Sequence, residues 1–310
     1  MEGDWLELSD LILDVGLGVR RPVEKRAVLE KVAKGRVAFG ARRIIEALPA
    51  RPDGTLDDAA VDDTLVAAHL ELQRLSSEFR QGPRLQETLA PIFDTLRASG
   101  AKTLRLIDLG CGVGYALRWL AAHRGLAEDV ELVGADFNPA LLDLARRAAQ
   151  SEGLSVRFVE ADALALAAEA PAGAVIISTG AIHHFRGEAL SALLANTARS
   201  AAACVHVDIK PSWVAPMGAW LFHQARMRVP LAQHDGLVSA LRAHPARTLF
   251  ETARAAAPGL KFAVLDGRVG LLPIVRIMHS LVGVRAEHAA EVEGRLGSLA
   301  RRLWPNGRLE

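Results

Sequence analysis

The chain has little cysteine and no long apolar run. Its 310 residues include two cysteines, Cys111 and Cys204, which lie far apart and have no metal-like spacing. This argues against a disulfide framework and a zinc site, and it fits a reducing cytoplasm. No apolar run approaches the roughly 20 residues that cross a bilayer, and the acidic N-terminus does not resemble a signal peptide. We expect a cytoplasmic protein without a membrane partner.

An excess of charge of one sign is also missing. The sequence has 37 basic and 36 acidic residues and a formal net charge of +1. No global field therefore attracts nucleic acid or an anionic membrane, and no nucleic-acid partner is expected. Half of the residues are hydrophobic, which predicts an ordinary packed core. Nothing in the composition distinguishes a monomer from a homodimer.

The periodicity of the apolar residues changes once along the chain. Residues 1–100 show helical spacing, clearest over 61–79 and 85–96, and no convincing strand. After that, short β-branched runs alternate with alanine-rich helical stretches, a pattern typical of βαβ units. The expected strands are 104–109, 130–135, 156–160, 174–178, 205–208, 261–265 and one near 275–284, and the expected helices are 115–123, 139–152, 188–202 and 248–256.

These patterns predict an α/β fold with a doubly wound, seven-stranded, mostly parallel sheet whose last strand is antiparallel. Residues 1–100 would form a helical lid or substrate region, and residues 101–310 a second domain with an insertion at about 211–246. Doubly wound sheets bind ligands beyond the carboxyl ends of their strands. The lid region and the insertion are therefore expected to cover that edge and to select the substrate.

A glycine-rich loop follows the first expected strand. Asp108 begins the pattern Asp-x-Gly-x-Gly-x-Gly, and helix-forming residues follow Gly114 at once. Glycines at 110 and 112 allow a tight turn and a close approach of the backbone to a ligand. A dinucleotide-binding loop would need its third glycine at position 115, which is Tyr. A phosphate-free ligand is favoured, and a NAD enzyme is the weakest alternative.

With this loop the chain resembles the class I S-adenosylmethionine-dependent methyltransferases, strongly over residues 104–208. The resemblance implies that S-adenosylmethionine is the cofactor and S-adenosylhomocysteine the product. Asp136, at the end of the second strand, would accept from both ribose hydroxyls, and Phe137 would pack on the adenine. The remaining implied cofactor residues are Asp108, Gly110, Cys111 and Gly112 in the loop, Asp162 and Ala163 beside the adenine amino group, and Thr179 and Gly180 beside the methionine moiety.

Catalytic candidates follow the fourth and fifth strands. His184, and after it His183, would act as a base or orient the acceptor, and Asp208 lies at the same edge. Each residue could instead have a structural role: the histidines could be hydrogen-bonded to the loop backbone, and Asp208 could cap the next segment. His234 and Asp235 resemble a turn that places an imidazole beside a carboxylate. No grouping has convincing metal spacing, because adjacent histidines point apart.

Two further groups of side chains have open roles. Trp213, Met217, Trp220 and Phe222 form either an apolar wall for an acceptor or the core of the insertion. Arg80 either reaches the cofactor carboxylate or is a solvated helix-end arginine.

The function expected is methyl transfer to O or N of a small-molecule acceptor, for example a secondary metabolite. The alternatives are an RNA or protein methyltransferase, or a module that binds the cofactor without methyl transfer.

Overall fold

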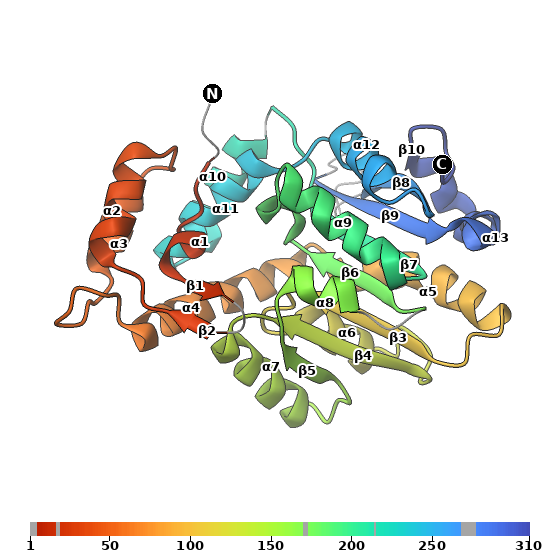
Figure 1. The fold of residues 1–310 in the computed structure, drawn as a ribbon, viewed down its shortest axis with the longest axis horizontal. Helices are drawn as coiled ribbons and strands as arrows, with labels where there is room; N and C mark the ends of the chain where they lie inside the picture. The colour runs from red at the N-terminus through yellow and green to blue at the C-terminus, as the bar shows by residue number, and fades with distance from the viewer. Residues whose placement is uncertain (1–4, 17–18, 170–172, 214, 268–276) are drawn as a thin grey trace. The chain divides into compact units, whose positions relative to one another are not determined.

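The computed structural model describes residues 5–16, 19–169, 173–213, 215–267 and 277–310 (Figure 1). Val275, where the last strand was expected to begin, lies outside these residues, as does Val214 in the insertion. The chain forms two compact units, one of residues 1–75 with 211–243 and the other of residues 76–210 with 244–310. None of the described helices has the length and apolar character needed to cross a membrane.

The second unit is built on one sheet. In the described residues its strands follow the order β10-β8-β9-β7-β6-β3-β4-β5, with β9 antiparallel to both neighbours and β10 antiparallel to β8 (Figure 1). The strands are β3 (Leu104–Leu109), β4 (Val130–Asp136), β5 (Arg157–Glu160), β6 (Val175–Thr179), β7 (Ala203–Ile209), β8 (Leu260–Gly267), β9 (Met278–Arg285) and β10 (Leu303–Trp304).

Helices cover both faces of this sheet. Successive residues of a strand point to opposite faces, so Leu106 and Ile107 of β3 belong to different hydrophobic clusters. One cluster includes side chains of α5, α6, α7 and α13, and the other those of α9 and α12. The helices are α5 (Gln81–Ala98), α6 (Tyr115–Ala122), α7 (Pro139–Ser151), α8 (Ala163–Glu169), α9 (Glu188–Ser200), α12 (Ala246–Ala256) and α13 (Ala286–Leu296), with the short turns η1 (Ile182–His184) and η2 (Gly297–Arg302).

The predicted doubly wound architecture is confirmed, with its antiparallel last main strand. The predicted strand count was one too low, because the two-residue strand β10 extends the edge beside β8. Such a short segment has no alternation to detect. Helix α8 was also missed, since only seven residues follow Asp162 as a helix.

The first unit joins the N-terminal residues to the insertion. Its helices are α1 (Leu8–Ile12), α2 (Lys25–Lys34), α3 (Ala41–Ala47), α4 (Asp58–Glu78, within this unit up to Leu75), α10 (Ala215–Arg226) and α11 (Pro230–Arg242). Strands β1 (Asp14–Gly16) and β2 (Val19–Arg21) form a small antiparallel sheet. The prediction of no strand in residues 1–100 was therefore wrong, because three-residue strands are too short to show a period of two.

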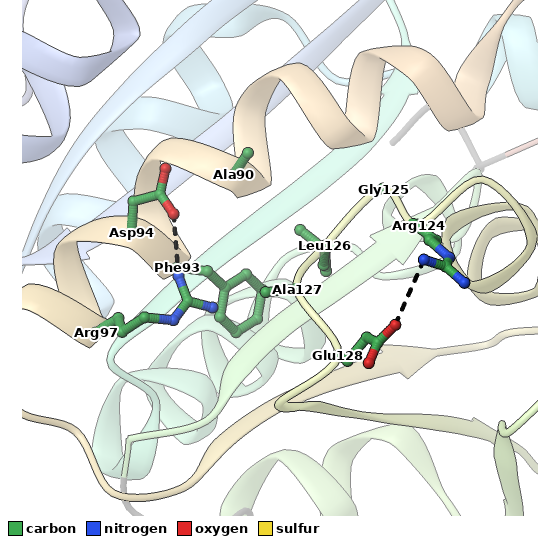
Figure 2. A pocket seen from close by; sticks show the side chains of 9 residues that line it. All are labelled: Ala90, Phe93, Asp94, Arg97, Arg124, Gly125, Leu126, Ala127 and Glu128. Carbon is green, nitrogen blue, oxygen red and sulfur yellow. Dashed lines mark hydrogen bonds and ion pairs between the residues drawn. The ribbon is translucent and has the colours of Figure 1, made fainter.

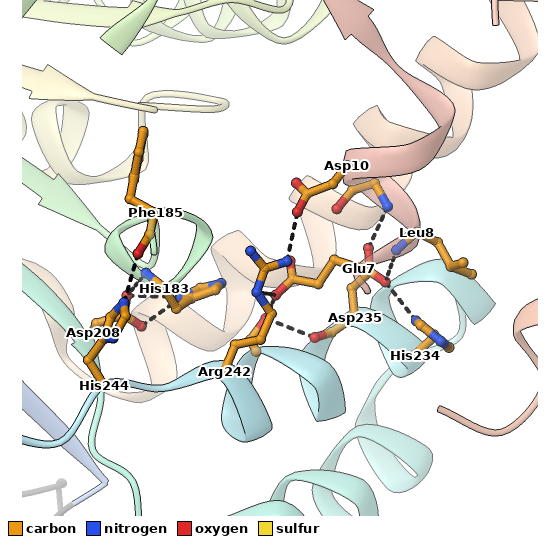
Figure 3. Close-up of polar contacts among 12 residues, drawn as sticks. Glu7, Leu8, Asp10, His183, Phe185, Asp208, His234, Asp235, Arg242 and His244 are labelled. Atoms are coloured by element: carbon orange, nitrogen blue, oxygen red, sulfur yellow. Dashed lines mark hydrogen bonds and ion pairs between the residues drawn. The ribbon is translucent and has the colours of Figure 1, made fainter. Parts of the chain in front are cut away.

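Helix α11 ties the insertion to the N-terminal segment within this unit. The carboxylate of Asp235 accepts hydrogen bonds from the backbone N–H of Leu8 at 2.8 Å and of Ser9 at 2.9 Å. It thereby satisfies free N–H groups at the start of α1. Arg242 donates to Asp10 at 2.7 Å (Figure 3). Residues more than 200 positions apart in sequence thus form one polar cluster.

Candidate active site

The site lies where the strand order of the second unit reverses. From β3 the chain continues through β4 to β5 in one direction, and β6 then pairs with the other side of β3. Ligands of doubly wound folds bind at this point. The loops after β3 and β6 are neighbours there, because a Cβ added to Gly110 would lie 3.3 Å from the Cβ of Ala181.

The backbone of the glycine loop has positive φ angles that residues other than glycine would adopt only with strain. Gly110, Gly112 and Gly114 have φ values of +67°, +53° and +72°, which lie in the left-handed region that glycine tolerates best. A Cβ on Gly114 would also lie 2.6 Å from the ring of Phe158. Gly114 precedes the first helical residue Tyr115, so the start of α6 is fixed close to the sheet.

Asp136, at the end of β4, holds this loop in place. Its Oδ2 accepts from the N–H of Gly112 at 2.8 Å, and its Oδ1 accepts from the N–H of Asn138 at 2.9 Å. Asn138 in turn caps α7, accepting from Ala140 N–H. A carboxylate oxygen can accept a second hydrogen bond. The carboxylate therefore has capacity for a ligand while it orders two loops.

Asp108 is the unusual group of the site. Its side chain is fully buried, and neither carboxylate oxygen has a hydrogen-bond partner among the described residues. Burial, together with the nearby charge of Asp136, raises the pKa of Asp108 to about 8. A buried carboxyl group without a partner costs free energy. The position is suited to a cation that would supply the missing partner.

The predicted adenine-binding residues lie at the end of β5. Asp162 is exposed, and its Oδ1 accepts from the N–H of Leu164 at 2.7 Å and of Ala165 at 3.1 Å. It therefore caps α8, whose first residue is Ala163. Phe137, after β4, is 46% exposed. Both side chains are accessible from solvent at the same edge of the sheet.

The loop after β6 carries a buried histidine and carboxylate. The N–H of Gly180 donates to the carbonyl of Val207 at 2.8 Å, which ties the residues after Thr179 to β7. His183 Nδ1 lies 2.9 Å from both carboxylate oxygens of Asp208, whose Oδ2 also accepts from the N–H of His183 (Figure 3).

Electrostatics fix the charge of this carboxylate. Burial alone would raise the pKa of Asp208, but the contacts with His183 and the N–H of Ile209 lower it to about 2. Because an ionised carboxylate only accepts hydrogen bonds, Nδ1 of His183 is the donor to Asp208. His184, the first-ranked candidate from the sequence, is half-buried, with its ring tilted 31° to that of His183 at a centroid distance of 4.5 Å.

Three further histidines surround this pair and were not predicted. His244 Nε2 lies 2.9 Å from the carbonyl of Phe185 (Figure 3). His279 is opposite Asp208 in the β7–β9 register, and His206 Nδ1 lies 2.9 Å from Ser178 Oγ. Burial lowers the pKa of both His206 and His279 to about 4, so both rings are neutral at pH 7. The sequence could have indicated His206, because residues 206 and 208 are two positions apart on one strand and therefore lie on the same face of the sheet as each other.

The histidine and carboxylate of the insertion have another role. His234 and Asp235 lie inside α11, so the predicted turn was wrong, although Nδ1 and Oδ1 are 2.7 Å apart. His234 Nε2 accepts from the N–H of Ala38 at 3.1 Å. Both ring nitrogens are thus used within the first unit, and the pair joins three segments of it.

The aromatic residues of the insertion do not form its core. Trp213, Met217 and Trp220 are 92%, 65% and 46% exposed. The packing of α10 on α11 depends instead on Gly236, where a Cβ would lie 1.8 Å from Cε1 of the buried His223.

Both cysteines are buried thiols. Burial raises the pKa of Cys111 well above its usual value and that of Cys204 to about 12. Neither is a thiolate at neutral pH, so neither is an activated nucleophile. Cys111 contributes to the loop through packing, since its Sγ would lie 2.9 Å from a Cβ on Gly134.

Two pockets lie beside helix α5. One, of about 300 Å³, is lined by the C-terminal half of the helix and residues 124–128, near the start of β4 (Figure 2). The other, of about 210 Å³, is lined by residues 80–88, by β7, β8 and β9, and by η2. Only the second lies at the carboxyl end of the sheet.

Residues 106–203 match the family described as a methyltransferase domain. The matched residues run from β3 to the start of β7 and include the glycine loop. A demethylmenaquinone methyltransferase of Thermus thermophilus is 50% identical over 62 residues, covering 20% of this chain and 27% of that protein. The same-named protein of Deinococcus radiodurans is 36% identical over 108 residues, covering 28% and 43%. The chain thus spans less than half the length of these relatives.

Two solved structures are also similar. Magnesium protoporphyrin IX methyltransferase from Synechocystis PCC 6803 with bound SAH has a TM-score of 0.48 at 18% identity, covering 74% of this chain and 100% of that one. The plantazolicin methyltransferase BpumL in complex with SAH has a TM-score of 0.48 at 12% identity, covering 73% and 97%.

Proposed function

We propose that the chain is an S-adenosylmethionine-dependent methyltransferase that acts on an oxygen or nitrogen atom of a small molecule. The observation that carries this proposal is the buried Asp108 carboxyl group, which has no hydrogen-bond partner among the described residues. It lies beside a glycine loop that Asp136 holds through the N–H of Gly112. The matched methyltransferase family, which includes this loop, supports the same function.

The residues present fit this cofactor. It would supply a methyl group on a positively charged sulfonium, together with an ammonium group. A cation near Asp108 would offset the cost of burying an ionised carboxylate. The glycine loop leaves its backbone accessible, Asp136 retains acceptor capacity for hydroxyl groups, and Phe137 offers an exposed ring.

The chain's own chemistry at the acceptor would come from His183. Asp208 fixes the proton on Nδ1, so Nε2 is the basic nitrogen, as in other histidine and carboxylate pairs. The contact with Asp208 supports His183 over His184 as the base, with Asp208 as a positioning residue. Methyl transfer also gains from alignment and exclusion of water, so the base would matter most for a hydroxyl acceptor or a protonated amine.

The two relatives named demethylmenaquinone methyltransferase favour a small-molecule acceptor. An RNA or protein acceptor would need a basic groove or a peptide channel, and the net charge of +1 offers no general attraction for nucleic acid. A module that binds the cofactor without transfer would show cofactor binding and no S-adenosylhomocysteine formation with any acceptor.

The test is calorimetric titration with S-adenosylmethionine and S-adenosylhomocysteine. We expect wild-type binding, and a loss of at least about 100-fold in affinity for Asp136→Ala, because both the hydroxyl acceptor and the anchor of the loop are removed. Asp143→Ala is the matched control, since Asp143 is an exposed acid on α7 paired only with Arg146 among the described residues. No binding by the wild type would overturn the proposal.

A further inference from the structure

The pocket at the N-terminal end of α5 combines an apolar floor with cationic walls. Val207, Leu265 and Met278, from three neighbouring strands, lie on one face of the sheet and form the floor. Arg80 and Arg84 border it from the helix side, and Arg302 borders it from η2. Among the described residues that line the pocket, Glu87 is the only acidic one.

One of the arginines that line this pocket, Arg84, has a buried donor group. Nη2 of Arg84 is buried and has no hydrogen-bond partner in the part of the chain that the structure describes. Burial, and then the nearby charge of Arg302, lower the pKa of Arg84. Asp266, next to Leu265 of the floor, accepts from Lys210 Nζ at 2.8 Å and 3.0 Å, and its backbone carbonyl accepts from Arg302.

The pocket is separate from the cofactor loop but adjoins the candidate catalytic strand. None of its lining residues belongs to the loop 108–114 or follows β4 or β5. Val207, in its floor, precedes Asp208 and accepts the hydrogen bond of Gly180 N–H at 2.8 Å. A molecule seated here would therefore lie on the opposite face of β7 from Asp208, close to the loop that carries His183.

We propose that this pocket binds a small organic carboxylate, with its apolar body on the floor and its charge on Arg84 and Arg302, and that it holds the anionic end of the methyl acceptor. The second part of this inference rests on the proposed methyltransferase function. A guanidinium matches a carboxylate with two parallel hydrogen bonds. An apolar cavity of about 150 Å³ accommodates benzene, so about 210 Å³ suits an acid of similar size.

The probe is benzoate, with benzamide as its uncharged counterpart of the same shape. Binding to the full-length protein is followed by ligand-observed NMR, and S-adenosylhomocysteine binding is measured in parallel by calorimetry. Arg84→Gln removes a half-buried charge, and Arg80→Gln removes an exposed charge at the rim. Arg147→Gln on α7 is the control at an exposed arginine away from the pocket.

We expect benzoate to bind the wild type and Arg147→Gln equally, at least about 10-fold more weakly to Arg84→Gln, and about 3-fold more weakly to Arg80→Gln. Benzamide should bind at least about 10-fold more weakly than benzoate. Equal benzoate binding by Arg84→Gln and the wild type, equal binding of the two probes, or no benzoate binding would overturn the proposal.

The parallel titration distinguishes the two proposals. Retained S-adenosylhomocysteine binding with no benzoate binding refutes the pocket alone, and benzoate binding without cofactor binding refutes the methyltransferase function alone. Thermal unfolding of each variant identifies any loss that comes from misfolding, and Arg80→Gln, at an exposed side chain, keeps the test valid if Arg84→Gln does not fold.

Discussion

The charged side chains at the two ends of helix α5 differ in exposure and in pairing. At the C-terminal end, Arg97 lies 3.0 Å from Asp94, and Arg124 lies 3.7 Å from Glu128 (Figure 2). Arg97 also lies 2.8 Å from Asp129. At the N-terminal end, Arg84 buries a donor without a partner among the described residues. Exposed pairs have little effect on stability, whereas unpaired buried groups destabilise a protein.

The same contrast holds for the sheet that the helix covers. At the amino end of the sheet, near the start of β4, the charged residues are exposed and paired. At the carboxyl end of the sheet, Asp108, His279 and Arg84 each have buried polar atoms without a partner among the described residues. Proteins tolerate such violations mainly at functional sites. Replacing these unpaired groups at the carboxyl end should therefore raise the free energy of unfolding of the protein. Replacing the paired charges at the amino end should lower it.

The largest effect is expected at Asp108. The unfolded chain releases this proton near pH 4, while the folded chain keeps it to about pH 8. Between these values the folded state binds more protons, so the group lowers stability as the pH rises, by at most about 1.4 kcal/mol per pH unit. Asp108→Asn should remove this dependence. Urea unfolding of variant and wild type from pH 5 to pH 8 should show a difference that grows with pH in favour of the variant.

A difference that stays constant with pH would contradict the assignment of a neutral, buried Asp108. The same variant should bind S-adenosylmethionine at least about 10-fold more weakly, because an amide cannot balance a cation as a carboxylate does. A matched Asp94→Asn variant, at the amino end, should bind S-adenosylmethionine as the wild type does, since Asp94 is exposed and paired with Arg97.

The second effect concerns His279 and has the opposite sign. Burial lowers its pKa to about 4, whereas an unfolded histidine titrates near 6.5. As the pH falls between these values, the unfolded chain gains a proton that the folded chain does not, and stability is lost by at most about 1.4 kcal/mol per pH unit. His279→Leu should unfold with a smaller loss between pH 6.5 and pH 4.5. An unchanged pH profile would mean that the ring is protonated in the folded state.

Sequence reasoning found the parts of this site that follow strand ends. The loop from Asp108 to Gly114, and Asp136 after β4, come directly after β-branched runs, so their position at one sheet edge follows from βαβ periodicity. Asp208 was found for the same reason. Asp162 was correctly placed after β5, but whether it caps a helix or contacts a ligand depends on backbone geometry that spacing does not determine.

What could not be predicted depends on pairing between distant segments. His279 meets Asp208 only through the antiparallel register of β7 and β9. Arg84 and Arg302 line one pocket, although Arg84 belongs to the helix before β3 and Arg302 to the turn between α13 and β10. The role of Asp235 in holding α1 likewise requires the tertiary structure, because its partners Leu8 and Ser9 lie near the other end of the chain.

A smaller effect is expected at Arg84. Arg84→Met keeps the apolar stem of the side chain and removes the buried donor without a partner. The variant should be more stable than the wild type by about 1 kcal/mol, measured as the free energy of unfolding in urea at pH 7. Benzoate should stabilise the wild type and not the variant. A destabilised variant would show that Arg84 is a structural residue.

The smallest effect on stability is expected at Arg97, which lies on the same helix as Arg84. Arg97→Met removes two exposed ion pairs, with Asp94 and Asp129, and leaves no buried group unsatisfied. Since such pairs contribute about 0.5 kcal/mol, the variant should be slightly less stable than the wild type at low salt, and the difference should fall as salt screens the charges. Two Arg→Met changes on one helix would then alter stability in opposite directions. If both changed stability in the same direction, helix propensity or lost packing would explain the effects, and Arg84 would no longer indicate a binding site held at a cost in stability.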